Sequence, residues 1–329
     1  MRVTNRMMSS SFLNDMNRNL NNMQKVQGQL TTGKLVNKPS DNPFVVARSM
    51  QLYSDISANE QYNTNIKDTT NWLDATDTAL GQVTDTLQRV RELMVTAGNA
   101  AYGTDEKNAI KDEINQRIEE VGTILNTSFD GKYIFGGTKG TSRPVTTEKD
   151  ADGNINISYA GKDGSKIPLN TSNHLEQAQL DMIGKDLSVE ISQGVTIEYN
   201  VNAKDVLEFE DSKGNSQNVM DLLSNITRNI GSENEEESSK VTGENLENMT
   251  RTIDNLLTLR AEVGAKQNRM ESAQSKNEEE NFNLTEVLSG NEDINFTEKR
   301  MESATMQTVY MASLQTASKV IQQTLLDYI

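Results

Sequence analysis

The sequence predicts a mainly α-helical protein with a β insert. Its N- and C-terminal segments are expected to form a long antiparallel helical bundle or coiled coil, with a small antiparallel β domain inserted mid-chain. Apolar residues recur at spacings of three and four from Leu73 to Ala97 and again in the last third of the chain, which is helical periodicity. Strict alternation over 154–159 and 195–201 is typical of strands. Only 34% of the 329 residues are hydrophobic, so narrow seams between helices are expected instead of one thick core.

The first helix is predicted to end at Gly33, because a residue with positive φ commonly follows a helix. Its apolar stripe consists of Phe12, Met16, Leu20, Met23 and Leu30. Asparagines crowd the same stretch and lower its intrinsic helicity, so the helix needs a packing partner. A second helix is expected to start at Pro43, with Asn42 as its N-cap.

The strongest periodic signal is a bundle seam on this second helix. Its members are Leu73, Leu80, Val83, Leu87, Val90 and Met94. Gly103 and Thr104 are predicted to break the helix and cap the next one, which carries an apolar face from Ile110 to Leu125. The two helices should therefore form an αα-hairpin.

Residues 134–240 are predicted to be the β-rich insert and its linker. A short helix is expected from Val219, and the acidic stretch 233–239 is expected to be a solvated linker. His174 is placed in a polar loop without a function. Asp150 to Asn154 hints at a calcium loop, but position twelve is Gly161 and not the bidentate glutamate, so a plain β-turn is the preferred interpretation.

Helical periodicity returns over 241–294, and Asn295 with Glu298 is a candidate capping box for a last helix. The apolar side of that helix carries Tyr310, Leu314, Ile321, Leu325 and Tyr328. Residues 1–38 carry a net charge of +5 (six bases, one acid) and residues 271–329 carry −6 (four bases, ten acids). Opposite charges favour packing of the two ends against each other, although apolar burial must supply most of the stabilisation.

Composition narrows the possible functions. The absence of Cys and the single His exclude thiolate and paired-His metal sites and any nucleophile–base pair, so no catalytic residue, cofactor or metal ligand is predicted. A net charge of −16 argues against nucleic-acid binding. No run approaches the ~20 apolar residues that a membrane span needs, and the N-terminus lacks the apolar run of a cleaved signal peptide.

Three motifs resemble the bacterial flagellin superfamily. The first is Leu30-Thr-Thr-Gly-Lys-Leu-Val-Asn-Lys-Pro-Ser-Asp-Asn-Pro43, the second lies at 260–270, and the third is the chain end at 310–329. The two prolines of the first motif and the last twenty residues are similar to the branch of the superfamily that joins the flagellar hook to the filament. The resemblance covers about 1–133 and 241–329.

This resemblance implies an extracellular structural protein of the flagellar hook–filament junction, exported without a cleaved signal peptide. The implied partners are further copies of the chain in a homo-oligomer, hook-associated protein 1, flagellin and a flagellar export chaperone. The expected organisation is an N-terminal polymerisation segment (1–42), two halves of a helical bundle (43–133 and 241–294), the inserted domain and linker (134–240), and a C-terminal polymerisation helix (295–329). The two apolar stripes at the chain ends are the candidate subunit interface.

Two alternative functions remain open at this stage. The chain could be a flagellin that forms the filament itself, or a cytoplasmic coiled-coil scaffold that is never exported. The segment 87–93 also resembles the part of flagellin that an innate Toll-like receptor recognises, but a coiled-coil surface is the preferred interpretation.

Overall fold

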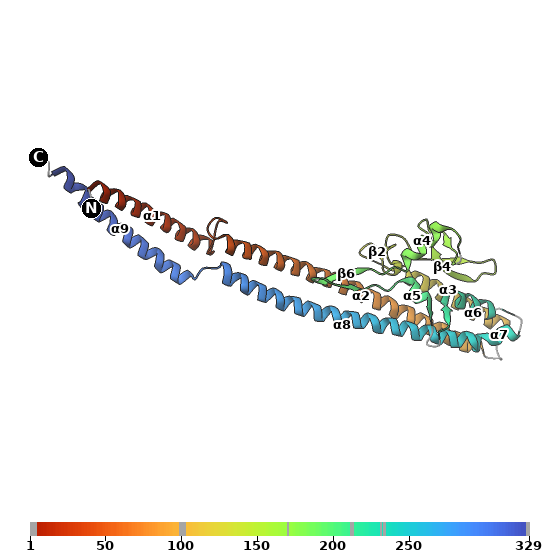
Figure 1. Cartoon of the computed structure of the whole chain (residues 1–329). Coiled ribbons are helices and arrows are strands. Elements are labelled where there is room, and N and C mark those ends of the chain that lie inside the picture. The colour runs from red at the N-terminus through yellow and green to blue at the C-terminus, as the bar shows by residue number, and fades with distance from the viewer. Residues whose placement is uncertain are drawn as a thin grey trace. The chain divides into compact units, whose positions relative to one another are not determined.

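The computed structural model describes residues 5–98, 103–169, 171–210, 214–230, 232 and 235–326, and the chain divides into two compact units. Unit 1 consists of Met1–Glu60 and Glu278–Ile329, and unit 2 of Gln61–Asn277. Two long helices, α2 (Pro43–Ala97) and α8 (Glu244–Glu292), contribute residues to both units (Figure 1). The structure is mainly helical with a small antiparallel β region in the middle of the chain, which confirms the predicted fold class.

Unit 1 is built by the two ends of the chain. Helix α1 (Asn5–Thr32) lies beside α9 (Phe296–Leu326) and antiparallel to it (Figure 1). Gly33 follows α1 with a φ of 74°, as predicted, and its carbonyl accepts a hydrogen bond from the Ile294 N–H at 3.0 Å. The Asn42 side chain accepts a hydrogen bond from the Val45 N–H at 3.4 Å, and Asn295 accepts one from Glu298 at 3.3 Å. These contacts are consistent with the predicted starts of α2 and α9.

The helical part of unit 2 consists of the remainder of α2 and α8 together with α3 (Thr104–Leu125). The side chain of Arg260 pairs with Asp77 at 2.9 Å and Gln267 donates to Asp74 at 2.7 Å. Asp74 precedes Asp77 in α2, whereas its partner Gln267 follows Arg260 in α8. The two helices are therefore antiparallel. Apolar residues of all three helices form one continuous core.

The β region consists, among the described residues, of four small antiparallel sheets. They pair β1 (Ser128–Phe129) with β2 (Lys132–Tyr133), β3 (Val145–Lys149) with β4 (Ile155–Ala160) and β5 (Lys166–Ile167), β6 (Ser188–Ser192) with β7 (Val195–Glu198), and β8 (Glu208–Glu210) with β9 (Ser216–Asn218). Asp130 and Gly131 close the first hairpin with φ values of 49° and 74°, the backbone that an Asp-Gly turn favours. Strands β3 and β4 pack on α3, and β4 also packs on α6 (Val219–Ile230).

Shorter helical elements complete unit 2. They are η1 (Ile134–Gly136), α4 (His174–Ile183), α5 (Ala203–Leu207), α6 (Val219–Ile230) and α7 (Glu235–Thr242). Helix α6 is strongly amphipathic and buries Leu222, Leu223 and Ile226. The short helix expected from Val219 is therefore present in the structure.

Three local predictions were wrong. His174 does not lie in a loop but opens α4, because Asn173 accepts a hydrogen bond from the Leu175 N–H at 3.1 Å and caps the helix. Residues 235–239 of the acidic stretch expected as a linker belong to α7, where glutamates at the N-terminal end interact favourably with the helix dipole. Thr104 is the first residue of α3, not its cap; the N-cap is Gly103, which offers no side-chain hydrogen bond.

Candidate assembly surface

An ion pair joins the end of α1 to the end of α8 in unit 1. Lys34 forms a salt bridge with Glu292, donates to the Tyr53 hydroxyl at 2.8 Å, and lies 5.2 Å from the centre of the Tyr53 ring. The hydrogen bond to Glu292, followed by the one to Tyr53, raises the pKa of the Lys34 ammonium. The backbone N–H of Leu35 donates to the Glu292 carbonyl at 2.6 Å. The residues after α1 are thereby fastened to both α2 and α8.

Unit 1 buries little apolar surface. Its buried hydrophobic side chains among the described residues are Val26, Leu52 and Leu288, whereas all members of the continuous core belong to unit 2. Large apolar side chains in unit 1 are instead exposed: Met7, Leu13, Leu35, Phe44, Met50, Tyr53, Phe282, Val287, Phe296, Met301, Val309, Met311 and Leu314. Phe44 is 83% exposed and Phe282 is 71% exposed. These exposed side chains are therefore the candidate contacts with other molecules.

The predicted interface residues fall on this unit. Phe12, Met16, Leu20, Met23 and Leu30 of α1 are half-buried, as is Tyr310 of α9, whereas Leu314 is exposed. The side chains of Ile321 and Leu325 and the whole of Tyr328 lie outside the described residues. The α1 stripe and Tyr310 are thus partly covered within the chain, because α1 and α9 pack on each other.

Sequence periodicity missed the most exposed apolar residues. Phe44, Met50, Phe282, Met301 and Met311 lie off the stripes and were not predicted. Reading one stripe per helix selects the side that packs within the chain.

The predicted seam residues lie at the centre of unit 2. Leu73, Leu80, Val83, Leu87, Val90 and Met94 are all at most 1% exposed, and they belong to one cluster with Ile118 of α3 and Val263 of α8. Within 87–93, Arg89 bonds to Glu113 of α3 at 2.9 Å and to Glu92 at 3.0 Å. This segment therefore belongs to the packing of α2 on α3.

The candidate calcium loop at Asp150 to Asn154 is a turn held by hydrogen bonds. The Asp150 carboxylate accepts hydrogen bonds from the N–H groups of Asp152 and Asn154 at 3.0 and 2.9 Å, which is the geometry of a plain turn. The hydrogen bond from Asn154 lowers the pKa of Asp150. Within the described ranges, no three His, Cys, Asp or Glu side chains gather as metal ligands would, and no helix is long and apolar enough to span a membrane.

Comparison with known families shows that the chain is similar to proteins of the bacterial flagellum. Residues 3–140 match the family described as the bacterial flagellin N-terminal helical region. A flagellin of Clostridium tyrobutyricum is 29% identical over 47% of this chain and 41% of its own length. The flagellin of Bacillus subtilis is 26% identical over 98% of this chain and 97% of that protein.

Within this class, the chain is similar to flagellar hook-associated protein 3. The Escherichia coli protein of that name is 24% identical over 95% of both chains. The crystal structure of flagellar hook-associated protein 3 from Legionella pneumophila shares the fold, with a TM-score of 0.57 and 12% identity over 73% of this chain and 98% of that one. The similarity to this branch of the flagellin superfamily agrees with the prediction from the sequence.

Proposed function

We propose that this protein joins the hook of the bacterial flagellum to its filament and assembles through unit 1. The observation that carries the proposal is the contrast between the units: unit 2 has a continuous core, whereas nearly all large apolar side chains described in unit 1 are exposed or only half-buried. Apolar surface stabilises a structure at roughly 25 cal/mol per Å² only when it is removed from water. Neighbouring copies in a homo-oligomer would remove it.

The further partners follow from the resemblance. We propose hook-associated protein 1 on the hook side, flagellin on the filament side, and an export chaperone that covers the C-terminal helix before secretion without a cleaved signal peptide. The half-buried α1 stripe and the exposed side of α9 support this, since a chaperone or a neighbouring subunit could cover them. We also propose that 1–42 and 295–329 are the polymerisation segments and that 43–133, 134–240 and 241–294 form the more stable part of the isolated chain.

Deletion of the gene tests the junction function. Cells should retain hooks, lack filaments and release flagellin into the medium, and a plasmid copy should restore motility. Filaments of normal length on deletion cells would contradict the proposal.

A matched pair of substitutions on α9 tests the assembly surface. Leu314→Asp should abolish complementation, because covering an unpaired carboxylate costs several kcal/mol. Thr305→Asp places the same charge at an exposed position on the opposite side of α9 and should be tolerated. The circular dichroism of both purified variants should match that of the parent. Motile cells with Leu314→Asp would show that this side chain is not covered on assembly.

Limited proteolysis tests the proposed boundaries. The isolated protein should be cleaved first within 1–42 and 295–329, leaving a resistant fragment from about 43 to 294. Equal resistance throughout would show that the terminal segments are stable without neighbours.

The second candidate function is that of a flagellin. It is favoured by the alignment with the Bacillus subtilis flagellin over nearly the whole of both chains. A flagellin should polymerise into long filaments when the purified protein is salted out, whereas a junction protein should form only short assemblies. Electron microscopy of the salted-out protein separates the two.

A further inference from the structure

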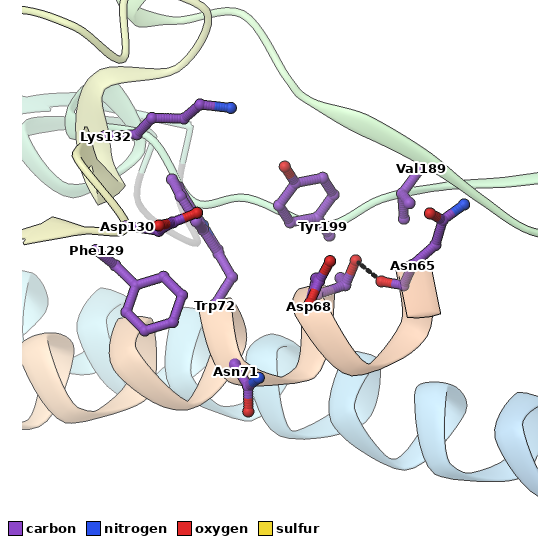
Figure 2. Close-up of a pocket in the computed structure, with 10 residues that line it drawn as sticks. Asn65, Asp68, Asn71, Trp72, Phe129, Asp130, Lys132, Val189 and Tyr199 are labelled. Carbon is purple, nitrogen blue, oxygen red and sulfur yellow. Dashed lines mark hydrogen bonds between the residues drawn. The ribbon is translucent and has the colours of Figure 1, made fainter. Parts of the chain in front are cut away.

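A cavity of about 610 Å³ lies in unit 2 between α2, the β1–β2 hairpin and the segment from β6 to Tyr199 (Figure 2). Its size is within the range of small-ligand sites. Trp72 forms part of the wall and is 7% exposed. Its indole Nε1–H is buried and has no hydrogen-bond partner among the described residues. A buried donor left without an acceptor is costly, and a ligand oxygen that reached it would remove that cost.

Aromatic rings form the apolar part of this cavity. The rings of Phe129 and Tyr199 lie 6.2 and 6.0 Å from the Trp72 ring, at interplanar angles of 89° and 87°. Figure 2 shows Trp72 edge-on between Phe129 and Tyr199, whose rings are both seen face-on. Aromatic faces carry negative partial charge and attract C–H groups. The two faces therefore form an apolar platform.

Hydrogen-bonding groups surround the rings. Asp68 and Asp130 provide carboxylates, Asn71 provides an amide and Lys132 an ammonium group. Two acids against one base give these side chains a net charge of −1, which disfavours phosphates and other anions. Asn65 is already engaged, since its amide donates to the Glu190 carbonyl at 3.0 Å and holds strand β6 at the edge of the cavity. The available groups are mostly acceptors, and they suit a ligand rich in hydroxyl donors.

We propose that this cavity is a binding site for a neutral oligosaccharide. A pyranose ring combines an apolar C–H face, which would stack on Tyr199 or Phe129, with hydroxyls that would donate to Asp68 and Asp130. The volume accommodates more than one sugar unit. A peptide segment of a second copy of the chain is the competing occupant, but its backbone offers a single donor per residue, fewer than the hydroxyls of a sugar unit offer to Asp68 and Asp130.

Trp72 is the single tryptophan of the sequence, so intrinsic fluorescence reports directly on this cavity. The full-length protein is titrated with cellotetraose, maltotetraose and N-acetylchitotetraose at concentrations up to the millimolar range. At least one should produce a saturable change in emission. Asp130→Ala should weaken that binding about tenfold through the loss of a charged hydrogen bond. Asp254→Ala, at an exposed carboxylate of α8 outside the cavity, should bind as the parent does.

Two substitutions of Tyr199 distinguish the loss of sugar stacking from misfolding of the protein. Tyr199→Phe keeps the ring face and should bind within a few-fold of the parent, whereas Tyr199→Ala should abolish saturation. The emission of each unliganded variant and its circular dichroism check the fold. No response to any of the three sugars, or unchanged binding by Asp130→Ala, would overturn the proposal. An emission change that depends on protein concentration alone would assign the cavity to a second copy instead.

Discussion

Lys34 and Glu292 form a salt bridge that ties the segment after the first helix to the end of α8. The Glu292 side chain is 11% exposed and that of Lys34 is 42% exposed, so removal of the lysine leaves a largely buried carboxylate without its cation. The two residues belong to opposite ends of the sequence, and the backbone hydrogen bonds beside them close the same junction.

Lys34→Met should therefore destabilise unit 1 by about 1–2 kcal/mol, less than for a fully buried pair because solvent screens the exposed ammonium. Hydrogen exchange at the Leu35 and Ile294 amides, which are bonded to Glu292 and Gly33, measures the effect. Lys25→Met, at an exposed lysine of α1, should leave both amides protected. Equal exchange in the two variants would contradict a stabilising function for this ion pair.

The seam of unit 2 should be sensitive to truncation. Leu87 is 1% exposed and Val95, on the same helix, is 56% exposed. Leu87→Ala should lower the free energy of unfolding by about 2–5 kcal/mol, since it removes buried methyl groups and leaves a cavity. Val95→Ala should change it by less than about 0.5 kcal/mol. Urea unfolding followed by circular dichroism measures both, and similar losses would show that burial is not what distinguishes these positions.

Asn277 secures the β6–β7 hairpin to α8. Its amide donates to the Ile191 carbonyl at 2.8 Å, and the residue is 1% exposed. Asn277→Ala should cost about 1–3 kcal/mol, because the carbonyl loses a buried donor. Amide exchange in β6 and β7 should accelerate more than in β3 and β4. Asn268→Ala, at an exposed asparagine of α8, is the control and should leave the hairpin unchanged.

Asp205 provides a prediction of pH dependence. It forms a capping box with Asn202, with hydrogen bonds of 3.0 and 3.1 Å. Burial, and then the negative charge of Asp186, raise the pKa of Asp205 above its ordinary 3.8. Since the folded state binds this proton more tightly than the unfolded chain, this carboxyl's contribution to stability rises as the pH falls through the folded-state pKa.

Asp205→Asn keeps an oxygen that can accept the hydrogen bond from the Asn202 N–H but removes the charge. The variant should be at least as stable as the parent at neutral pH. Its advantage should shrink as the pH falls through the raised pKa of Asp205 toward the ordinary value. Thermal melts of the two proteins across that range measure the difference. If Asp205→Asn were less stable than the parent at neutral pH and gained relative stability on acidification, the pKa of Asp205 would not be raised in the folded protein.

The helical architecture could be predicted because it depends on local, repeating information. Spacings of three and four place Leu73 to Met94 on one side of α2 whatever the partner, and Gly33, Pro43 and Asn295 mark helix ends through backbone chemistry that acts within a few residues. The motifs around Pro39 and at 310–329 likewise indicated the flagellin superfamily before any fold was known.

Other features depend on tertiary contacts and capping hydrogen bonds that local sequence patterns do not specify. The polar run around His174 reads as a loop until Asn173 is seen to cap α4, and an acidic stretch reads as a linker until it appears as α7. Trp72, Phe129 and Tyr199 are far apart in sequence, and only the docking of two hairpins on α2 brings them together.

The sequence by itself determined the helices, their apolar stripes and the class of protein, because periodicity and capping are properties of neighbouring residues. Only the tertiary structure decided which apolar side chains are covered. Phe44 of α2, Phe282 of α8 and Leu314 of α9 remain exposed in unit 1, while Leu87 lies in one apolar cluster with residues of α3 and α8. Burial depends on which distant segments meet, and the hydrophobicity of a residue alone does not specify its partner.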